Sequence, residues 1–460
     1  MIGAVPSKDV TGHPAVMGRS MRKYFAYTAI SVASRLVVNA LLFVVLARLW
    51  GPEGFGVFAF VLSTCALVML IADFGFPTFL LREVAAYASR ASELIGQGLR
   101  LKACLTLAMV LVSIMVAVGL GPHALPVDLF CPLLISTLLL SFAEYFAAPL
   151  RAIGRYDLEA LLASTGNTAQ FILAGGIAWA GGTTVEVAWA ILVARLLYAI
   201  ASIRVLKGSV PRVSLWQSSG SIRETWRIVW PYGIDAALTS VWSYVDVLAI
   251  RLLFGVHAVG LYAAGQKIVQ GVVGLAPVVG NVMIPRLAYE TQSRGHYTWR
   301  TGGLTAALMI GIGVAFAFPL IAFPSAITTS IFGTGYSQLS HWLPWFGAIL
   351  LVRYVGAGFG TVLSAIGLQK RRMVGQIAAI AVYMVSMAVV AWAGMGIDMA
   401  LCALFIAMSV MGCVYLLCLR RTAVFEGQRH PGNRYLRLLA VLLGSGVRDA
   451  GVGATPKDDR

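Results

Sequence analysis

Charged residues are scarce in this chain. Asp, Glu, Lys and Arg together make up 12% of its 460 residues, whereas hydrophobic residues make up 59%. Soluble proteins contain about 25% charged residues on average. So low a charged fraction excludes an ordinary soluble domain, and it predicts a polytopic membrane protein whose helices mostly contact lipid or one another.

The sequence also lacks the motifs on which soluble enzymes and metal proteins depend. Its six cysteines lie inside apolar runs without metal-ligand spacing, which predicts no disulfide framework and no metal site. It contains no G-x-x-x-x-G-K-[ST] motif, which disfavours ATP hydrolysis by this chain. The six histidines are scattered, with no second ligand at a suitable spacing. We therefore expect no cofactor, no metal and no catalytic residues.

What the chain does contain is a succession of apolar runs. A bilayer is crossed by about 20 apolar residues in a helix. Twelve runs of that kind lie near residues 25–49, 56–80, 101–120, 127–150, 160–181, 185–205, 231–253, 259–284, 304–330, 342–365, 374–394 and 399–419. The sequence thus predicts an all-α polytopic membrane protein with about twelve transmembrane helices.

The basic residues are distributed unevenly between the two sides of these runs. The chain has 35 Lys and Arg against 19 Asp and Glu, a formal charge of +16. Most of the basic residues lie in the two tails and in alternate loops, such as the loop after the second run with Arg82, Arg90, Arg100 and Lys102. Because cytoplasmic loops of membrane proteins are enriched in Lys and Arg, we expect both termini in the cytoplasm and no nucleic-acid partner.

The chain repeats itself. A shift of 204 residues aligns GPEGFGVFAF (51–60) with GVHAVGLYAA (255–264), and LRAIG (150–154) resembles LSAIG (363–367). Six helices separate the two halves, so both enter the membrane in the same sense. We predict two six-helix bundles related by a pseudo-twofold axis around a central cavity. The expected divisions are an N-terminal tail 1–24, an N-lobe 25–205, a cytoplasmic linker 206–230, a C-lobe 231–419 and a C-terminal tail 420–460.

The glycine-rich stretch 48–58 joins the first two runs. Its three glycines and Pro52 fit a tight turn between antiparallel helices, and its place away from the cytoplasm argues against a phosphate-binding loop.

Four basic residues lie well inside the runs, namely Arg35, Arg195, Lys267 and Arg353. A charge at that depth costs about 2.5–3.5 kcal/mol on insertion scales unless it faces water or a partner. Two interpretations are open. The four residues either line an anion-binding cavity, or they form structural ion pairs within the bundles.

Other polar residues recur at helical spacing. Ser31, Arg35 and Asn39 form one stripe, and the shift of 204 places them on Asp235, Thr239 and Ser243. We expect the two stripes to face each other across the pseudo-twofold axis. For each polar residue the alternative is an ordinary hydrogen bond between helices. The candidates for the cavity wall or for ion coupling are Asn39, Asp73, Glu144, Asp235, Asp246 and Gln270.

Five segments, in this order, resemble a known family. They are RLWGPEGFGVFAF (48–60), DFGFPTFLLREVA (73–85), APLRAIGRY (148–156), VDVLAIRLLFGVHAVGLYAAGQKI (245–268) and AIGLQKRR (365–372). The chain resembles the Wzx-type polysaccharide flippases of the multidrug/oligosaccharidyl-lipid/polysaccharide exporter superfamily.

The resemblance implies two six-helix lobes around a cavity. It also implies that an oligosaccharide linked to undecaprenyl pyrophosphate moves from the cytoplasmic to the periplasmic leaflet of the bacterial inner membrane by alternating access, for surface polysaccharide such as O-antigen, capsule or exopolysaccharide. The family has a cationic cavity, for which Arg35, Arg195, Lys267 and Arg353 are the matching candidates. Membrane lipid, a glycan polymerase and a co-polymerase would be its partners.

Other functions remain open. A multidrug/cation antiporter of the same superfamily would share the fold, although four buried bases suit a cationic substrate poorly. A non-transporting membrane scaffold of a glycan-assembly complex would depend on its loops and not on its intramembrane charges. An integral glycosyltransferase is a third possibility, but it would normally carry a large loop with acidic catalytic residues.

Overall fold

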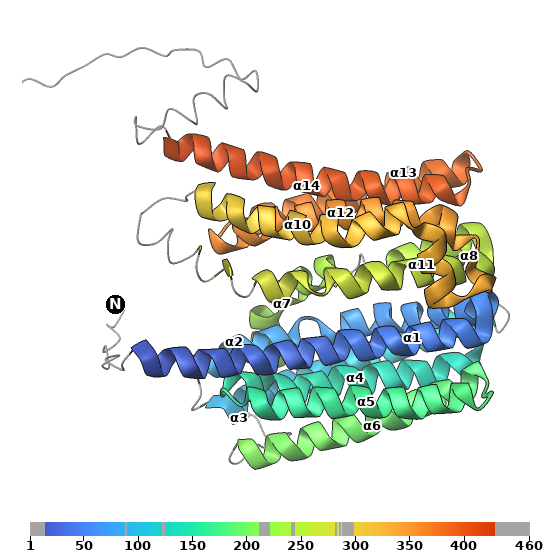
Figure 1. Ribbon diagram of the computed structural model, residues 1–460. Helices are drawn as coiled ribbons and strands as arrows, with labels where there is room; N and C mark the ends of the chain where they lie inside the picture. Colours follow the sequence, from blue (N-terminus) through green and yellow to red (C-terminus); the bar gives the residue numbers. More distant parts are fainter. Residues whose placement is uncertain are drawn as a thin grey trace, which may run out of the picture.

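The computed structural model describes residues 14–87, 90–121, 125–210, 221–240, 244–280, 283–284, 287 and 299–427. These residues form helices and turns without any strand (Figure 1). The first half contains α1 (Pro14–Asp73), α2 (Phe76–Ala86), α3 (Ala91–Leu120), α4 (Val127–Ala152), α5 (Tyr156–Trp179) and α6 (Thr184–Ser209). The second half contains α7 (Ile222–Ser240), α8 (Val245–Val273), α10 (Trp299–Ala322), α11 (Pro324–Phe332), the 3-10 turn η3 (Thr334–Tyr336), α12 (Leu339–Ala365), α13 (Gln369–Trp392) and α14 (Ile397–Gly427). The predicted all-α class is confirmed.

Within the described part of the chain, nine helical stretches are long and apolar enough to cross a membrane. The longest, Ile30–Ala86, has 57 residues and accommodates two crossings, since about 20 residues suffice for one. Val245–Gly280 completes the seventh crossing, which α7 begins, and supplies the eighth. If α5, which is not among these nine stretches, is counted as the fifth crossing, the helices match the twelve apolar runs.

A sharp bend interrupts α1 at Gly51 and α8 at Gly255. Gly51 has φ 66° and ψ −177°, and Gly255 has φ 85° and ψ −174°. This backbone conformation is open to glycine and strained for other residues. The two bends, which we call the elbows, lie 204 residues apart, the shift found in the sequence. The stretch 48–58 is therefore a bend between two crossings, as predicted.

The repeat extends to the ends of other helices. Gly154 after α4 and Gly367 after α12 have φ values of 81° and 80°. The turns around them have matching hydrogen bonds, because Arg155 N donates to Leu150 O and Leu368 N donates to Leu363 O. The similarity of LRAIG to LSAIG thus reflects the same helix ending in both halves.

The two halves form two lobes that lie side by side (Figure 1). In the N-lobe α4 packs against α6, and in the C-lobe α10 packs against α12. The main contact between the lobes is that of α1 with α8. The two-lobed architecture is that expected from the sequence. Residues 1–13, 211–220 and 428–460, which include much of both predicted tails and of the linker, lie outside the described residues.

The lobes meet most closely at the elbows. A Cβ atom on Gly56 would collide with the backbone of Val256, and one on Gly260 would collide with the backbone of Pro52. The shift of 204 turns one of these contacts into the other, so the pseudo-twofold axis passes between them. Glycine at both positions is what allows the two helices to approach this far.

Further contacts continue the same antiparallel register along both helices. The two residue numbers of each pair add up to 310, 311 or 312. We call this set the lobe seam, and it comprises the pairs Leu36–Gly274, Phe43–Lys267, Pro52–Gly260, Gly56–Val256 and Phe60–Arg251.

Candidate functional site

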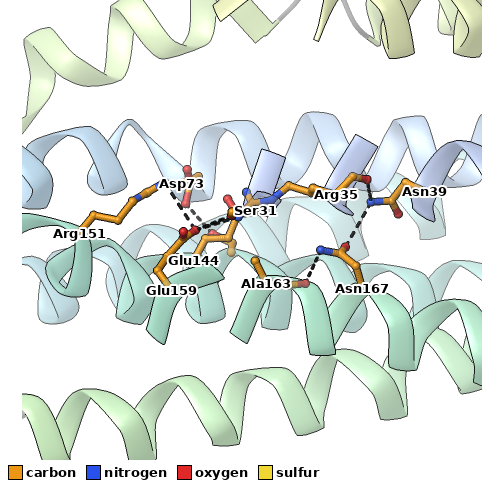
Figure 2. Close-up of polar contacts among 10 residues, drawn as sticks. Ser31, Arg35, Asn39, Asp73, Glu144, Arg151, Glu159, Ala163 and Asn167 are labelled. Atoms are coloured by element: carbon orange, nitrogen blue, oxygen red, sulfur yellow. Dashed lines mark hydrogen bonds and ion pairs between the residues drawn. The ribbon is translucent and has the colours of Figure 1, made fainter. Parts of the chain in front are cut away.

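Arg35 is the centre of an ion-pair network inside the N-lobe. Its Nη1 lies 2.7 Å from Glu144 Oε1 on α4, and its Nη2 lies 3.4 Å from Glu159 Oε1 on α5 (Figure 2). Glu159 is 2% exposed, and it also accepts a hydrogen bond from Ser31 Oγ at 3.1 Å and pairs with Arg151 at 3.9 Å. Two carboxylates thus neutralise Arg35. Of the two interpretations of this residue, the structure shows the structural ion pair.

Hydrogen bonds extend this network through α5 to α6. Asn39 Nδ2 donates to Arg35 O at 2.7 Å and to Asn167 Oδ1 at 3.3 Å (Figure 2). Gln170 Nε2 donates to Asn39 Oδ1 at 3.3 Å, and Arg195 Nε donates to Gln170 Oε1 at 3.1 Å. One continuous chain of polar groups therefore joins Arg35 to Arg195.

Arg195 differs from Arg35 in its partners. Its Nη1 donates to Ser136 Oγ at 3.3 Å, so both of its hydrogen bonds go to neutral side chains. Among the residues that the structure describes, no carboxylate lies within 4.0 Å of it. Of these two intramembrane arginines, Arg35 is paired with carboxylates, whereas Arg195 is hydrogen-bonded to neutral side chains.

Lys102 forms a second ion pair, which the sequence did not reveal. Its Nζ lies 2.8 Å from Asp73 Oδ1 and 2.5 Å from Ser141 Oγ, and Ser141 in turn donates to Asp73 at 2.7 Å. The ammonium is surrounded by the rings of Phe76, Phe142 and Tyr145 at 5.3–5.8 Å, and the side chain is 0% exposed. The prediction that Lys102 belongs to a cytoplasmic loop is wrong, because α3 begins at Ala91, well before the apolar run.

The two predicted intramembrane bases of the C-lobe, Lys267 and Arg353, have different surroundings. Lys267 Nζ lies 3.0 Å from Gln270 Oε1 and 4.2 Å from the centroid of the Phe43 ring. Arg353 lies on α12 and is part-buried. In the described part of the structure neither side chain has a carboxylate within 4.0 Å.

Asp246 is the buried acid of the C-lobe, with 4% exposure. Its Oδ2 accepts hydrogen bonds from Tyr262 Oη at 2.6 Å and Gln266 Nε2 at 2.5 Å, and its Oδ1 accepts one from the Val247 amide at 2.8 Å. Neutral donors thus hold this carboxylate, whereas the N-lobe carboxylates have cationic partners. The Asp235 backbone lies in α7, but its side chain is outside the described residues.

The structure brings the predicted residues together in three groups. Arg35, Asn39, Glu144 and Arg195 share the N-lobe network, Asp73 pairs with Lys102, and Lys267 binds Gln270. The stripe of Ser31, Arg35 and Asn39 contacts α4 and α5 of its own lobe instead of facing the other lobe as expected.

The sequence interpretation missed three residues of the N-lobe network, all on α5. Glu159, Asn167 and Gln170 are separated by eight and three residues, spacings that return to the same face of a helix. That spacing could have identified them. In the part of the chain that the structure describes, no three His, Cys, Asp or Glu side chains group as a metal site.

Comparison with protein families decides the assignment. A family model described as "Polysaccharide biosynthesis protein" matches residues 20–289. The chain belongs to this family. The matched region of this chain covers the N-lobe, both elbows and the helices of the lobe seam.

Solved structures share the fold of this chain. A structure titled as the inward-facing conformation of a multidrug resistance MATE family transporter of the MOP superfamily has a TM-score of 0.67 and 15% identity, and the match covers 86% of this chain and 99% of that one. A MOP superfamily transporter from Pyrococcus furiosus, whose title reports reverse polarity of its binding pocket, has a TM-score of 0.62 and 14% identity over 88% of this chain and 96% of that one. Comparison with curated protein sequences gives no match. At these identities the likeness shows the two-lobed membrane fold.

Proposed function

We propose that this protein moves an oligosaccharide linked to undecaprenyl pyrophosphate from the cytoplasmic to the periplasmic leaflet of the bacterial inner membrane. The product would supply surface polysaccharide, and the lobes would expose the substrate to each side in turn. The supporting observation is the set of three intramembrane bases, Arg195, Lys267 and Arg353, which have no carboxylate within 4.0 Å among the described residues.

A phosphate group suits these three side chains. An unpaired charge within the membrane is unfavourable, and an anion relieves this cost. Guanidinium groups bind phosphate oxygens in pairs, while an ammonium acts as a compact point charge. Arg35 is a weaker candidate for phosphate binding than the sequence suggested, because Glu144 and Glu159 occupy its guanidinium. We assign Arg35 the role of joining α1 to α4 and α5.

The direction of transport rests on the distribution of charge in the loops. With both termini in the cytoplasm, a negative head group moves outward, along an inside-negative membrane potential. The potential then contributes about 2.3 kcal/mol per charge per 100 mV. Glycan polymerase and co-polymerase would be the partners that use the product.

The polarity of the site separates this function from cation export. The reverse polarity reported for the Pyrococcus furiosus transporter is linked in its title to a different function within the superfamily. Three intramembrane bases, Arg195, Lys267 and Arg353, have no carboxylate within 4.0 Å among the described residues, which favours an anionic substrate over a cationic drug.

Translocation in liposomes tests the proposal. The purified protein is reconstituted with a fluorescent undecaprenyl-pyrophosphate-linked oligosaccharide, and the label that reaches the outer leaflet is quenched. We expect the combined variant Arg195→Gln, Lys267→Gln and Arg353→Gln to lose at least about tenfold in rate, since each charge-assisted hydrogen bond contributes about 1.5–3 kcal/mol. Arg90→Gln, which removes an exposed base, is the control.

Two results would contradict the proposal. One is a triple variant that inserts normally and still moves the lipid at the wild-type rate. The other is a deletion strain that becomes sensitive to cationic drugs while its surface polysaccharide stays intact, which is the outcome for a drug antiporter. Harmless charge substitutions combined with damaging loop substitutions would point to the scaffold function.

A further inference from the structure

Lys267 belongs to the C-lobe, but its ammonium rests on a ring of the N-lobe. Its Nζ lies 4.2 Å from the centroid of Phe43 on α1, within the range of a cation–π interaction. Lys267 Nζ also donates a hydrogen bond to Gln270 Oε1 on its own helix at 3.0 Å. The N-lobe thus stabilises the Lys267 charge with an aromatic face, where an ion pair would use a carboxylate.

This contact lies within the lobe seam. Phe43 precedes Gly51 by eight residues, which places it about 12 Å below the elbow at 1.5 Å per residue. The Pro52–Gly260 contact flanks it on the elbow side and the Leu36–Gly274 contact flanks it on the other. A separation that begins at the elbows therefore reaches the Phe43–Lys267 contact before it reaches the Leu36–Gly274 contact.

The separation leaves the lysine in an unfavourable state. With the ring gone, the charge keeps the Gln270 oxygen and has no carboxylate within 4.0 Å among the described residues. A charge within the membrane then requires another partner. An anionic head group can take that place, because a charged hydrogen bond to phosphate is stronger than a contact with a ring.

We propose that Phe43 is a positioning residue that holds Lys267 while the site is empty, and that the phosphate of the substrate replaces the ring when the lobes part at the elbows. Opening at the elbows thereby depends on the bound anion. This inference rests on the proposed function and adds a substrate-dependent lock to it.

The proposal predicts the sign of two measurements. A contact present in one of two states favours that state by its own free energy, so loss of the ring shifts the empty protein toward the elbow-open state. By linkage, the same loss raises the affinity for an anion. The range of cation–π strengths corresponds to a change of about two- to thirtyfold in each quantity.

The elbow separation is measured by pulsed electron paramagnetic resonance on the full chain in nanodiscs. Spin labels are attached at Glu53→Cys and His257→Cys, two exposed elbow residues, in a chain whose six native cysteines are replaced by serine. We expect Phe43→Leu to enlarge the elbow-open population of the empty protein, and inorganic pyrophosphate to do the same in wild type. Phe43→Tyr keeps the aromatic face and should match wild type.

Calorimetry with inorganic pyrophosphate gives the second measurement. Phe43→Leu should bind it more tightly, and the same substitution should have no effect when combined with Lys267→Gln. Phe171→Leu, which removes an N-lobe ring outside the seam, is the matched control. It should alter neither quantity if the effect comes from the cation–π contact.

Three results would overturn the lock. They are an unchanged elbow population in Phe43→Leu, a weaker affinity for pyrophosphate in that variant, or an equal response in Phe171→Leu. If these occur while the triple charge variant still abolishes glycan translocation, the lock fails and the proposed function stands. If wild type binds no pyrophosphate and the triple variant transports normally, both fail.

Discussion

The two lobes have the same backbone architecture, but their buried basic residues have different kinds of partner. In the N-lobe Arg35 lies against Glu144 and Glu159, and Lys102 lies against Asp73. In the C-lobe Lys267 rests on a ring and an amide oxygen. The elbows and helix ends are nevertheless repeated with nearly equal backbone angles. The two halves are therefore more alike in backbone geometry than in the pairing of their buried charges.

The acids differ between the lobes in the same way. Asp73, Glu144 and Glu159 each contact a basic side chain, whereas Asp246 accepts hydrogen bonds from the neutral donors Tyr262 and Gln266. The N-lobe charges contribute to its own cohesion. Lys267 and Arg353 of the C-lobe have no carboxylate within 4.0 Å among the described residues, and the following variants examine this difference between the lobes.

Lys102→Ala should have the largest effect on stability. The change leaves Asp73 without its cation inside the N-lobe, and breaking a buried ion pair costs about 3–5 kcal/mol. Thermal unfolding in detergent measures the loss. Lys102→Met combined with Asp73→Leu should recover most of it, because an apolar pair of similar volume avoids the unpaired charge. Equal destabilisation by Lys267→Met would show that the C-lobe depends on its bases just as much.

Gly260→Ala tests the close contact between the two lobes at the lobe seam. The added methyl group would meet the backbone of Pro52, so we expect a destabilisation of about 1–3 kcal/mol as the lobes move apart. By symmetry Gly56→Ala should cost a similar amount. Gly271→Ala on the same helix is the control, since its Cβ would meet nothing within 4 Å. Unequal costs at Gly56 and Gly260 would break the symmetry of the seam.

Arg35→Met and Arg353→Met should have different effects. Arg35 is about a third exposed and paired, so its loss should destabilise the protein by about 1–2 kcal/mol. Arg353→Met should leave the unfolding temperature close to wild type and lower translocation. Unfolding curves and the liposome assay on the same preparations separate the two effects. A stable Arg35→Met protein with no transport would reverse the assignment.

Arg155→Gln should have the smallest effect, and it should depend on pH. Hydrogen bonds from Arg155 hold the pKa of the Asp157 carboxyl below its usual 3.8, at the exposed start of α5. The fold thus favours ionised Asp157, and this contribution is present above about pH 3.8 and disappears as the pH falls through the lowered pKa. Unfolding temperatures of wild type and variant should differ slightly at pH 7 and converge in acid. A difference that persists in acid would exclude this ion pair as its source.

The crossings and the elbows could be predicted from the sequence. Apolar run lengths mark the helices, and the glycines at 51 and 255 stand out because bends at the helix ends require them. Intramembrane bases are equally visible, since few charges interrupt the runs. These features depend on residues that are close together in the chain.

The partners of the bases could not be predicted. Arg35 and Glu159 are 124 residues apart, and their contact depends on how α1 and α5 are rotated about their axes. Lys102 was assigned to a loop because apolar content alone does not show how far a helix continues beyond its lipid-facing run. Neutral partners such as Gln170 are harder to predict, because nothing in the sequence distinguishes them from other polar residues. Only the structure shows that Gln170 lies beside Arg195.

The constant register of the lobe seam restricts how the lobes can move. Sliding by one helical turn, about 5.4 Å, would carry Gly56 away from Val256 and bring bulkier residues to a place where only glycine fits. The same shift would disrupt every other pair of the seam at once. Tilting that begins at the elbows, in contrast, separates the pairs in sequence along the two helices. The close contact at the two glycines therefore permits tilting of the lobes and blocks translation along the helix axes.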